Sequence, residues 1–216
     1  MIAEGNSIKV ASHFANARQQ ETAARFGMWI FLATEVLFFG VLFTGYTLTR
    51  FLHPEAFVEG GRHTNVILGS INTAVLLTSS LTMGLAVRAG EAGWRRSGAT
   101  WLAVTAILGA IFLGIKGYEW HQEWLDGLTP GPRFDYDGPD ASGVELFFFL
   151  YFVMTGAHAL HLAIGIAVVA AIAVLASRGR FSARYHTPVV LSGLYWHFID
   201  VVWIFLYPLF YLVARS

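Results

Sequence analysis

The chain has 216 residues, of which 56% are hydrophobic and 13% are charged, and it contains no cysteine. Soluble globular proteins carry about 25% charged residues, so this composition is typical of a membrane protein. The equal numbers of acidic and basic side chains argue against a nucleic-acid partner, and the lack of cysteine excludes disulfides, iron–sulfur clusters and a cysteine nucleophile.

Five apolar runs predict the architecture. A helix needs about 20 mostly apolar residues to cross a bilayer. We therefore expect an all-α integral membrane protein with a five-transmembrane-helix bundle over 28–214, and spans at about 28–50, 66–87, 98–116, 146–177 and 188–214. The polar N-terminal segment at 1–27 is expected to form a short interfacial helix or a tail. The fourth run is longer than a bilayer requires, so its helix is expected to tilt or to project.

The distribution of Lys and Arg predicts the orientation. Nine of these residues lie in the N-terminal segment and in the loops 88–97 and 178–187, and five lie on the other side. Because cytoplasmic loops are enriched in basic residues, the N-terminus is expected in the cytoplasm and the C-terminus outside. The connection 116–145 on the outer side is rich in Pro, Gly and Asp, which predicts an exposed irregular loop.

Five ionisable residues interrupt the apolar runs: Glu35, His158, His161, His197 and Asp200. At a rise of about 1.5 Å per residue, all five can lie at a similar depth in the membrane. Such groups are costly in a bilayer and usually face other helices. The two spacings of three residues place each pair on one helix face. A metal site, a proton relay or a hydrogen-bonded packing network would each fit. The Glu-x-x-His repeat of di-iron bundles is missing, which favours the packing network.

Motifs in the five spans resemble subunit III of the haem–copper respiratory oxidases. The first span is similar to the family's Gly-Met…Ser-Glu-Val-x-Phe-Phe helix and places Glu35 at its glutamate. The second resembles Leu-Asn-Thr-x-Val-Leu-Leu, and the third ends in a similar Glu-aromatic pair. The fourth resembles Thr-Gly-x-His-x-x-His and the fifth Tyr-Trp-His-Phe-x-Asp-x-x-Trp. The matching segments are 27–39, 71–77, 116–120, 155–161 and 195–203. One acidic residue of the family is replaced here by Val190, so its role cannot be transferred.

The resemblance implies the five-helix bacterial form of this subunit, located in the bacterial inner membrane. It implies an accessory, non-redox subunit of a terminal oxidase that reduces oxygen to water with cytochrome c as the donor. No cofactor, metal or catalytic centre is then expected in this chain. Haem and copper would reside in the catalytic subunit I, with subunit II and phospholipids as further partners. The five membrane-embedded polar residues would support lipid binding or proton uptake.

Other functions fit part of the same pattern. Within the same superfamily, the chain could be the third subunit of a quinol oxidase or the related subunit that accompanies nitric oxide reductase. A self-contained membrane metalloprotein would use His158, His161 and His197 as ligands. A proton-coupled transporter would use Glu35 and Asp200 as proton carriers.

Overall fold

The computed structural model describes residue 12, residues 14–183 and residues 185–215. Over this part of the chain the regular structure is helical, apart from one isolated bridge between Ser182 and Tyr185. Five helices in it are long and apolar enough to cross a membrane, which confirms the predicted all-α, five-span fold. They are α1 (Ala17–Leu52), α3 (Val66–Glu91), α4 (Arg95–Leu125), α5 (Ala141–Ser177) and α6 (Thr187–Tyr211). The orientation of the termini stays a prediction.

The first helix begins earlier than the apolar run alone indicates. Asn16 is its N-cap, and the Asn16 side chain accepts a hydrogen bond from the amide of Gln19 at 2.9 Å. This cap satisfies one of the free amides at a helix start. The described part of the predicted N-terminal segment, from residue 17 onward, is therefore the first part of α1 rather than a separate element. Residues 1–11 and 13 lie outside the described residues.

The end of the bundle that carries the C-terminus is more helical than predicted. A short helix, α2 (Pro54–His63), follows α1 and has proline at its first position, where the missing amide costs nothing. The predicted bounds of the loop 116–145 are wrong at both ends, because α4 continues to Leu125 and α5 begins at Ala141. Only 126–140 is a connection. The last span also ends earlier than expected, and η1 (Val213–Arg215) follows it.

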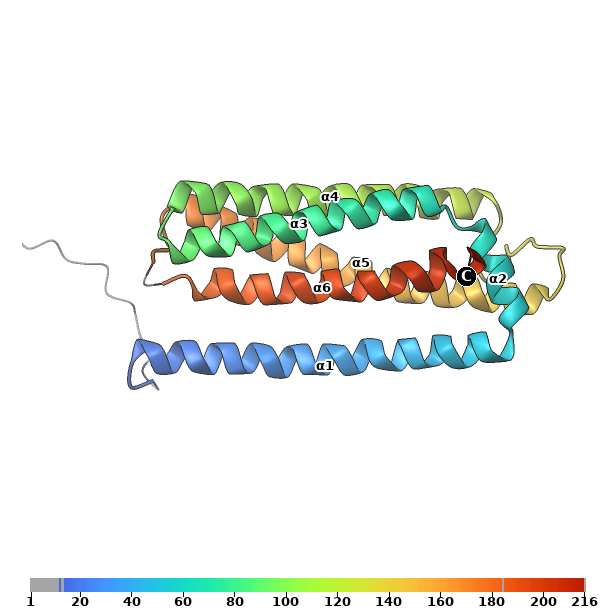
Figure 1. The fold of residues 1–216 in the computed structure, drawn as a ribbon, viewed down its shortest axis with the longest axis horizontal. Helices are drawn as coiled ribbons and strands as arrows, with labels where there is room; N and C mark the ends of the chain where they lie inside the picture. The colour runs from blue at the N-terminus through green and yellow to red at the C-terminus, as the bar shows by residue number, and fades with distance from the viewer. Residues whose placement is uncertain (1–11, 13, 184, 216) are drawn as a thin grey trace, which may run out of the picture.

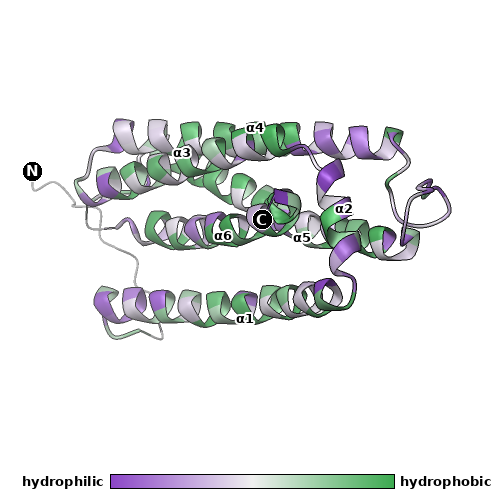
Figure 2. Cartoon of the chain, turned by 45° about the vertical axis from the view of Figure 1, so that its right-hand side comes forward, coloured by the Kyte–Doolittle hydropathy of each residue, from purple (hydrophilic) through white to green (hydrophobic). Residues whose placement is uncertain are grey.

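The helices form a four-helix body with α1 beside it (Figure 1). α3 packs against α4 and α6, and α5 packs against the same two helices from the other side. α1 contacts α5 and α6 along its length and α2 at its end, and has no contact with α3 or α4 over the described residues. Figure 2 shows the hydrophobic residues along the middle of the helices and the hydrophilic ones toward their ends. The fold thus has one packed body and one loosely attached helix.

The fourth span is long enough to project beyond a bilayer. With 37 residues, α5 measures about 55 Å, against roughly 30 Å of hydrocarbon. Its N-terminal end packs against α2 (Figure 1). Asp140 begins this helix with a φ of 49°, and its carboxylate accepts the amide of Gly143 at 3.2 Å. This hydrogen bond lowers the pKa of Asp140 below its usual value, and His53, 3.3 Å away, contributes in the same direction.

Acidification should weaken this cap. Because the pKa of Asp140 is lower in the folded chain than in the unfolded one, the stabilisation is present above the usual carboxyl pKa and is lost as the pH falls through the lowered value. We expect amide hydrogen exchange over 141–145 to accelerate at low pH relative to Asp140→Asn, which keeps an acceptor that does not titrate. An unchanged ratio between the two proteins at every pH would contradict this prediction.

Candidate functional site

The first polar contact joins α1 to α5. Glu35 Oε2 lies 2.9 Å from His161 Nε2, and His161 Nδ1 donates to the carbonyl of Ala157 at 2.7 Å. Because Nδ1 is thereby a donor, one shared proton lies between His161 Nε2 and Glu35. The Tyr195 hydroxyl donates to the His161 carbonyl at 3.1 Å, and the ring of Phe39 packs 5.2 Å from the imidazole. This pair is the only polar side-chain contact between α1 and α5 over the described residues.

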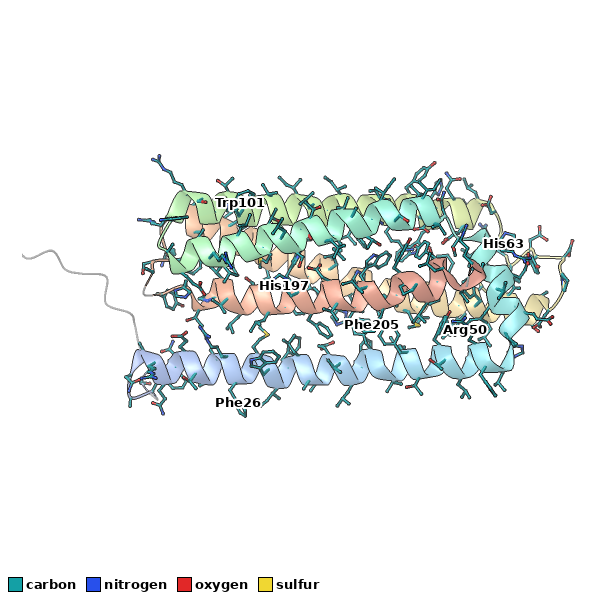
Figure 3. All side chains as sticks on the ribbon, in the orientation of Figure 1. Phe26, Arg50, His63, Trp101, His197 and Phe205 are labelled. Atoms are coloured by element: carbon teal, nitrogen blue, oxygen red, sulfur yellow. The ribbon has the colours of Figure 1, made fainter. Side chains whose placement is uncertain are left out.

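The second contact joins α3 to α6. His197 Nδ1 lies 2.8 Å from the hydroxyl of Ser80 and 3.8 Å from Asp200 Oδ2. Asp200 is buried, whereas the His197 side chain is 44% exposed. The predicted sharing of one helix face by His197 and Asp200 is therefore seen, although neither Asp200 carboxyl oxygen has a hydrogen-bond partner among the described residues. The hydrogen bond with Ser80 is the contact that orients the imidazole at the surface of α6 (Figure 3).

His158 occupies a third position, in an aromatic box. Its ring lies 5.2 Å from the ring of Trp203 and 5.6 Å from that of Phe112. It is buried, and neither ring nitrogen has a hydrogen-bond partner among the described residues. His158 therefore packs within the four-helix body, whereas His161 faces α1.

The five predicted polar residues are thus divided among three places. Glu35 and His161 form one pair, His197 and Asp200 another, and His158 lies apart. Over residues 12, 14–183 and 185–215, no three His, Asp or Glu side chains come together in an arrangement that could hold a metal ion. The ligand set of the metalloprotein alternative is not assembled, because these side chains face different neighbouring helices.

A second polar group was not predicted from the sequence. We call it the Lys116 cluster and define it as Lys116, Glu119, Glu123, Tyr151 and Tyr211. All five side chains are buried, with exposed fractions of 4% or less. Lys116 Nζ lies 3.1 Å from Glu119 Oε2 and donates to the hydroxyls of Tyr151 at 2.5 Å and Tyr211 at 2.6 Å. The sequence places Lys116 at the junction between the third predicted span, 98–116, and the predicted connection, 116–145. The spacing of three, then four, residues between its charged members was the signal that could have indicated a shared helix face.

An apolar groove separates α1 from α6. It has a volume of about 680 Å³ and is open along one side, and Trp29, Val36 and Leu37 contribute from α1. Leu194, Phe198 and His197 contribute from α6, so one imidazole stands at an otherwise hydrocarbon surface. Figure 3 shows the side chains of both helices along this space, while Phe26 points away from the body.

Together these features define an integral membrane subunit whose ionisable side chains hold helices together and whose first helix borders an apolar groove. The chain belongs to the cytochrome c oxidase subunit III family, since the family model of that description matches residues 5–215. This agrees with the resemblance of its five motifs.

Individual relatives have the same assignment. The chain is 34% identical to cytochrome c oxidase subunit 3 of Thermostichus vulcanus, over 88% of this chain and 87% of the relative. It is 31% identical to a probable quinol oxidase subunit 3 of Staphylococcus epidermidis, over 94% of this chain and 97% of the relative. It is also 32% identical to a heme-copper oxidase subunit I+III of Aeropyrum pernix, over 88% of this chain and 22% of that protein. The chain is therefore a subunit III of the haem–copper oxidases.

Proposed function

We propose that the chain is the accessory, non-redox subunit III of a bacterial terminal oxidase that reduces oxygen to water and receives electrons from cytochrome c. In this role it packs against the haem- and copper-bearing subunit I and lies in the same inner-membrane complex as subunit II, with its N-terminus in the cytoplasm. The observation that carries the proposal is the match to the subunit III family over nearly the whole chain.

Within that complex, we assign the groove between α1 and α6 to the acyl chains of a phospholipid. Its lining is almost entirely apolar, and its volume is in the range of a site for a small molecule or part of a lipid. The half-exposed His197 supplies a polar contact at its wall. Glu35 and His161 fix the distance between α1 and the body, and Ser80 orients His197, with the Asp200 carboxyl 3.8 Å from the imidazole. His158 stiffens the adjoining packing through its contact with Trp203.

Glu35→Ala tests this role. The substitution leaves His161 Nε2 without its partner and should weaken the attachment of α1 by about 1–3 kcal/mol. In the purified oxidase we expect an unchanged haem spectrum and a near-normal initial rate, followed by an earlier loss of activity during sustained turnover. Retained phospholipid, measured by mass spectrometry, should fall as well. Glu35→Gln, which keeps a hydrogen-bonding partner for His161, should show a smaller effect on both readouts.

The exposed Glu91 at the end of α3 provides a matched control, and Glu91→Ala should behave as the wild type. Loss of haem from the Glu35→Ala complex would contradict the accessory role. A chain that carries out proton-coupled flux alone in vesicles would favour the transporter alternative instead.

A quinol oxidase is the second candidate, because relatives with that name match the chain over as much of its length as those named for cytochrome c. The purified complex should oxidise reduced cytochrome c and should not oxidise a soluble ubiquinol analogue. The opposite preference would establish the quinol oxidase. Mass spectrometry of the intact complex would identify the partner subunits and provide an independent assignment of the donor.

A further inference from the structure

The Lys116 cluster lies between α4, α5 and α6, toward the end of the bundle that carries α2 and the C-terminus (Figure 1). Its charged members come from α4, and its two hydroxyls come from Tyr151 on α5 and Tyr211 on α6. It shares no residue with the contacts made by Glu35, His197 or Asp200. The role proposed for those residues therefore leaves the cluster without a function.

All three donors of Lys116 are used, and Glu119 accepts through Oε2, whereas its Oε1 has no hydrogen-bond partner among the described residues. An ammonium group has three donors, and Lys116 Nζ directs them to Glu119 Oε2, to the Tyr151 hydroxyl and to the Tyr211 hydroxyl. Tyr211 in turn donates to Glu119 Oε2 at 2.8 Å. Glu119 Oε2 therefore receives two hydrogen bonds, one of them from a cation. Such an environment stabilises an ionised carboxylate at position 119.

Glu123 has no comparable support. It is 4% exposed, and neither carboxyl oxygen has a hydrogen-bond partner among the described residues, although the Tyr151 hydroxyl lies nearby. The titratable groups that act on it are Lys116, Glu119, Tyr151 and Tyr211, together with Asp126 just beyond the helix. Four of these five groups are acidic, namely Glu119, Asp126 and the two tyrosines, so none of the four can compensate a negative charge on Glu123. The single cation, Lys116, is already paired with Glu119.

A buried carboxylate without a donor or a cation of its own is strongly unfavourable. With both glutamates ionised, the cluster would carry one uncompensated negative charge. One bound proton neutralises that charge and needs no cavity within the packed cluster. A metal cation would have to share the site with the Lys116 ammonium, which repels it.

We propose that Glu123 is a proton-binding site, so that the cluster contains the Lys116 ammonium, the Glu119 carboxylate and a neutral carboxylic acid at Glu123. The proton is exchanged with water at the adjacent end of the bundle, because α4 ends two residues later and Asp126 begins an exposed connection. Release of the proton converts the acid to a carboxylate and leaves the other members unchanged. The subunit thus carries a proton-exchanging group separate from the Glu35–His161 pair.

Infrared spectroscopy of the purified oxidase tests this assignment. The spectrum of the wild type minus that of Glu123→Gln, at neutral pH, should contain the C=O band of a protonated carboxyl group. That band should shift in heavy water, since the proton exchanges. The wild type minus Glu91→Gln, a change at an exposed glutamate, should lack it. A carboxylate band in place of the C=O band for Glu123→Gln would overturn the proposal.

The thermal stability of two variants provides a second readout. Glutamine replaces a neutral acid closely but cannot replace a carboxylate, so Glu123→Gln should keep the wild-type unfolding midpoint whereas Glu119→Gln should lower it. The reverse order would place the proton on Glu119 and overturn the assignment. Failure of the Glu123→Gln complex to assemble would overturn it as well, because a neutral group of the same shape is expected to be accepted at this site.

Discussion

Replacing Lys116 with methionine should destabilise the subunit by about 3–5 kcal/mol, the usual cost of removing one partner from a buried ion pair. The Glu119 carboxylate, 3.1 Å from the ammonium and 2% exposed, would then be left without its cation. Tyr151 and Tyr211 would also lose the donor that links them. The measurement is the temperature at which the subunit unfolds or leaves the detergent-solubilised complex, followed by gel analysis and by differential scanning fluorimetry.

The double variant Lys116→Met with Glu119→Gln serves as the control for charge. It removes both members of the ion pair, so it should recover much of the lost stability, because two neutral groups leave no buried charge. Arg96→Met, at an exposed position, should behave as the wild type. A double variant as unstable as Lys116→Met alone would show that the shape of the lysine side chain, rather than its charge, supports the fold.

Trp196→Ala should cost a similar amount, about 3–5 kcal/mol, for a different reason. Trp196 is fully buried, and its Nε1 donates to the Ser79 hydroxyl at 3.2 Å. Two glycines make room for the Trp196 ring. A Cβ added at Gly109 would lie 2.8 Å from the ring, and a Cβ added at Gly165 would lie 3.4 Å from it. Truncation would leave a cavity where four helices meet, and backbone segments without side chains cannot fill it.

Trp94→Ala is the matched control, because Trp94 is 67% exposed. The subunit with this change should assemble and unfold as the wild type does, while Trp196→Ala should lower the unfolding midpoint by several degrees or prevent assembly. Trp196→Phe should fall between the two, since it keeps part of the ring volume and loses the hydrogen bond to Ser79. Equal stability of all three variants would contradict the central packing role of Trp196.

The number of membrane-spanning helices could be predicted because length and hydropathy are local properties. A run of about 20 apolar residues has few structures available to it in a bilayer, where backbone groups must be satisfied within the segment. The ends were less predictable. The continuation of α4 to Leu125 depends on the packing of Glu119 and Glu123 against Tyr151 and Tyr211, which lie far away in the sequence.

Only part of the candidate site could be predicted, because residue spacing within one helix is a local property whereas contacts between helices are not. Helical spacing placed His197 and Asp200 on one face, and the structure confirms that contact. Spacing also placed His158 and His161 on one face of their helix, but it could not show that one faces Trp203 and the other Glu35. Those partners are set by the rotation of α5 against its neighbours, and this rotation is a property of the assembled bundle.

The sparse attachment of α1 has a consequence for biogenesis. The partners of this helix, His161 on α5 and the Leu209 carbonyl on α6, which accepts the Tyr46 hydroxyl, belong to the last two spans to leave the ribosome. The segment synthesised first can therefore find its place only after nearly all of the chain has been inserted. Until then α1 lies in the bilayer as an isolated helix, and the Glu35 carboxyl lacks its partner on α5.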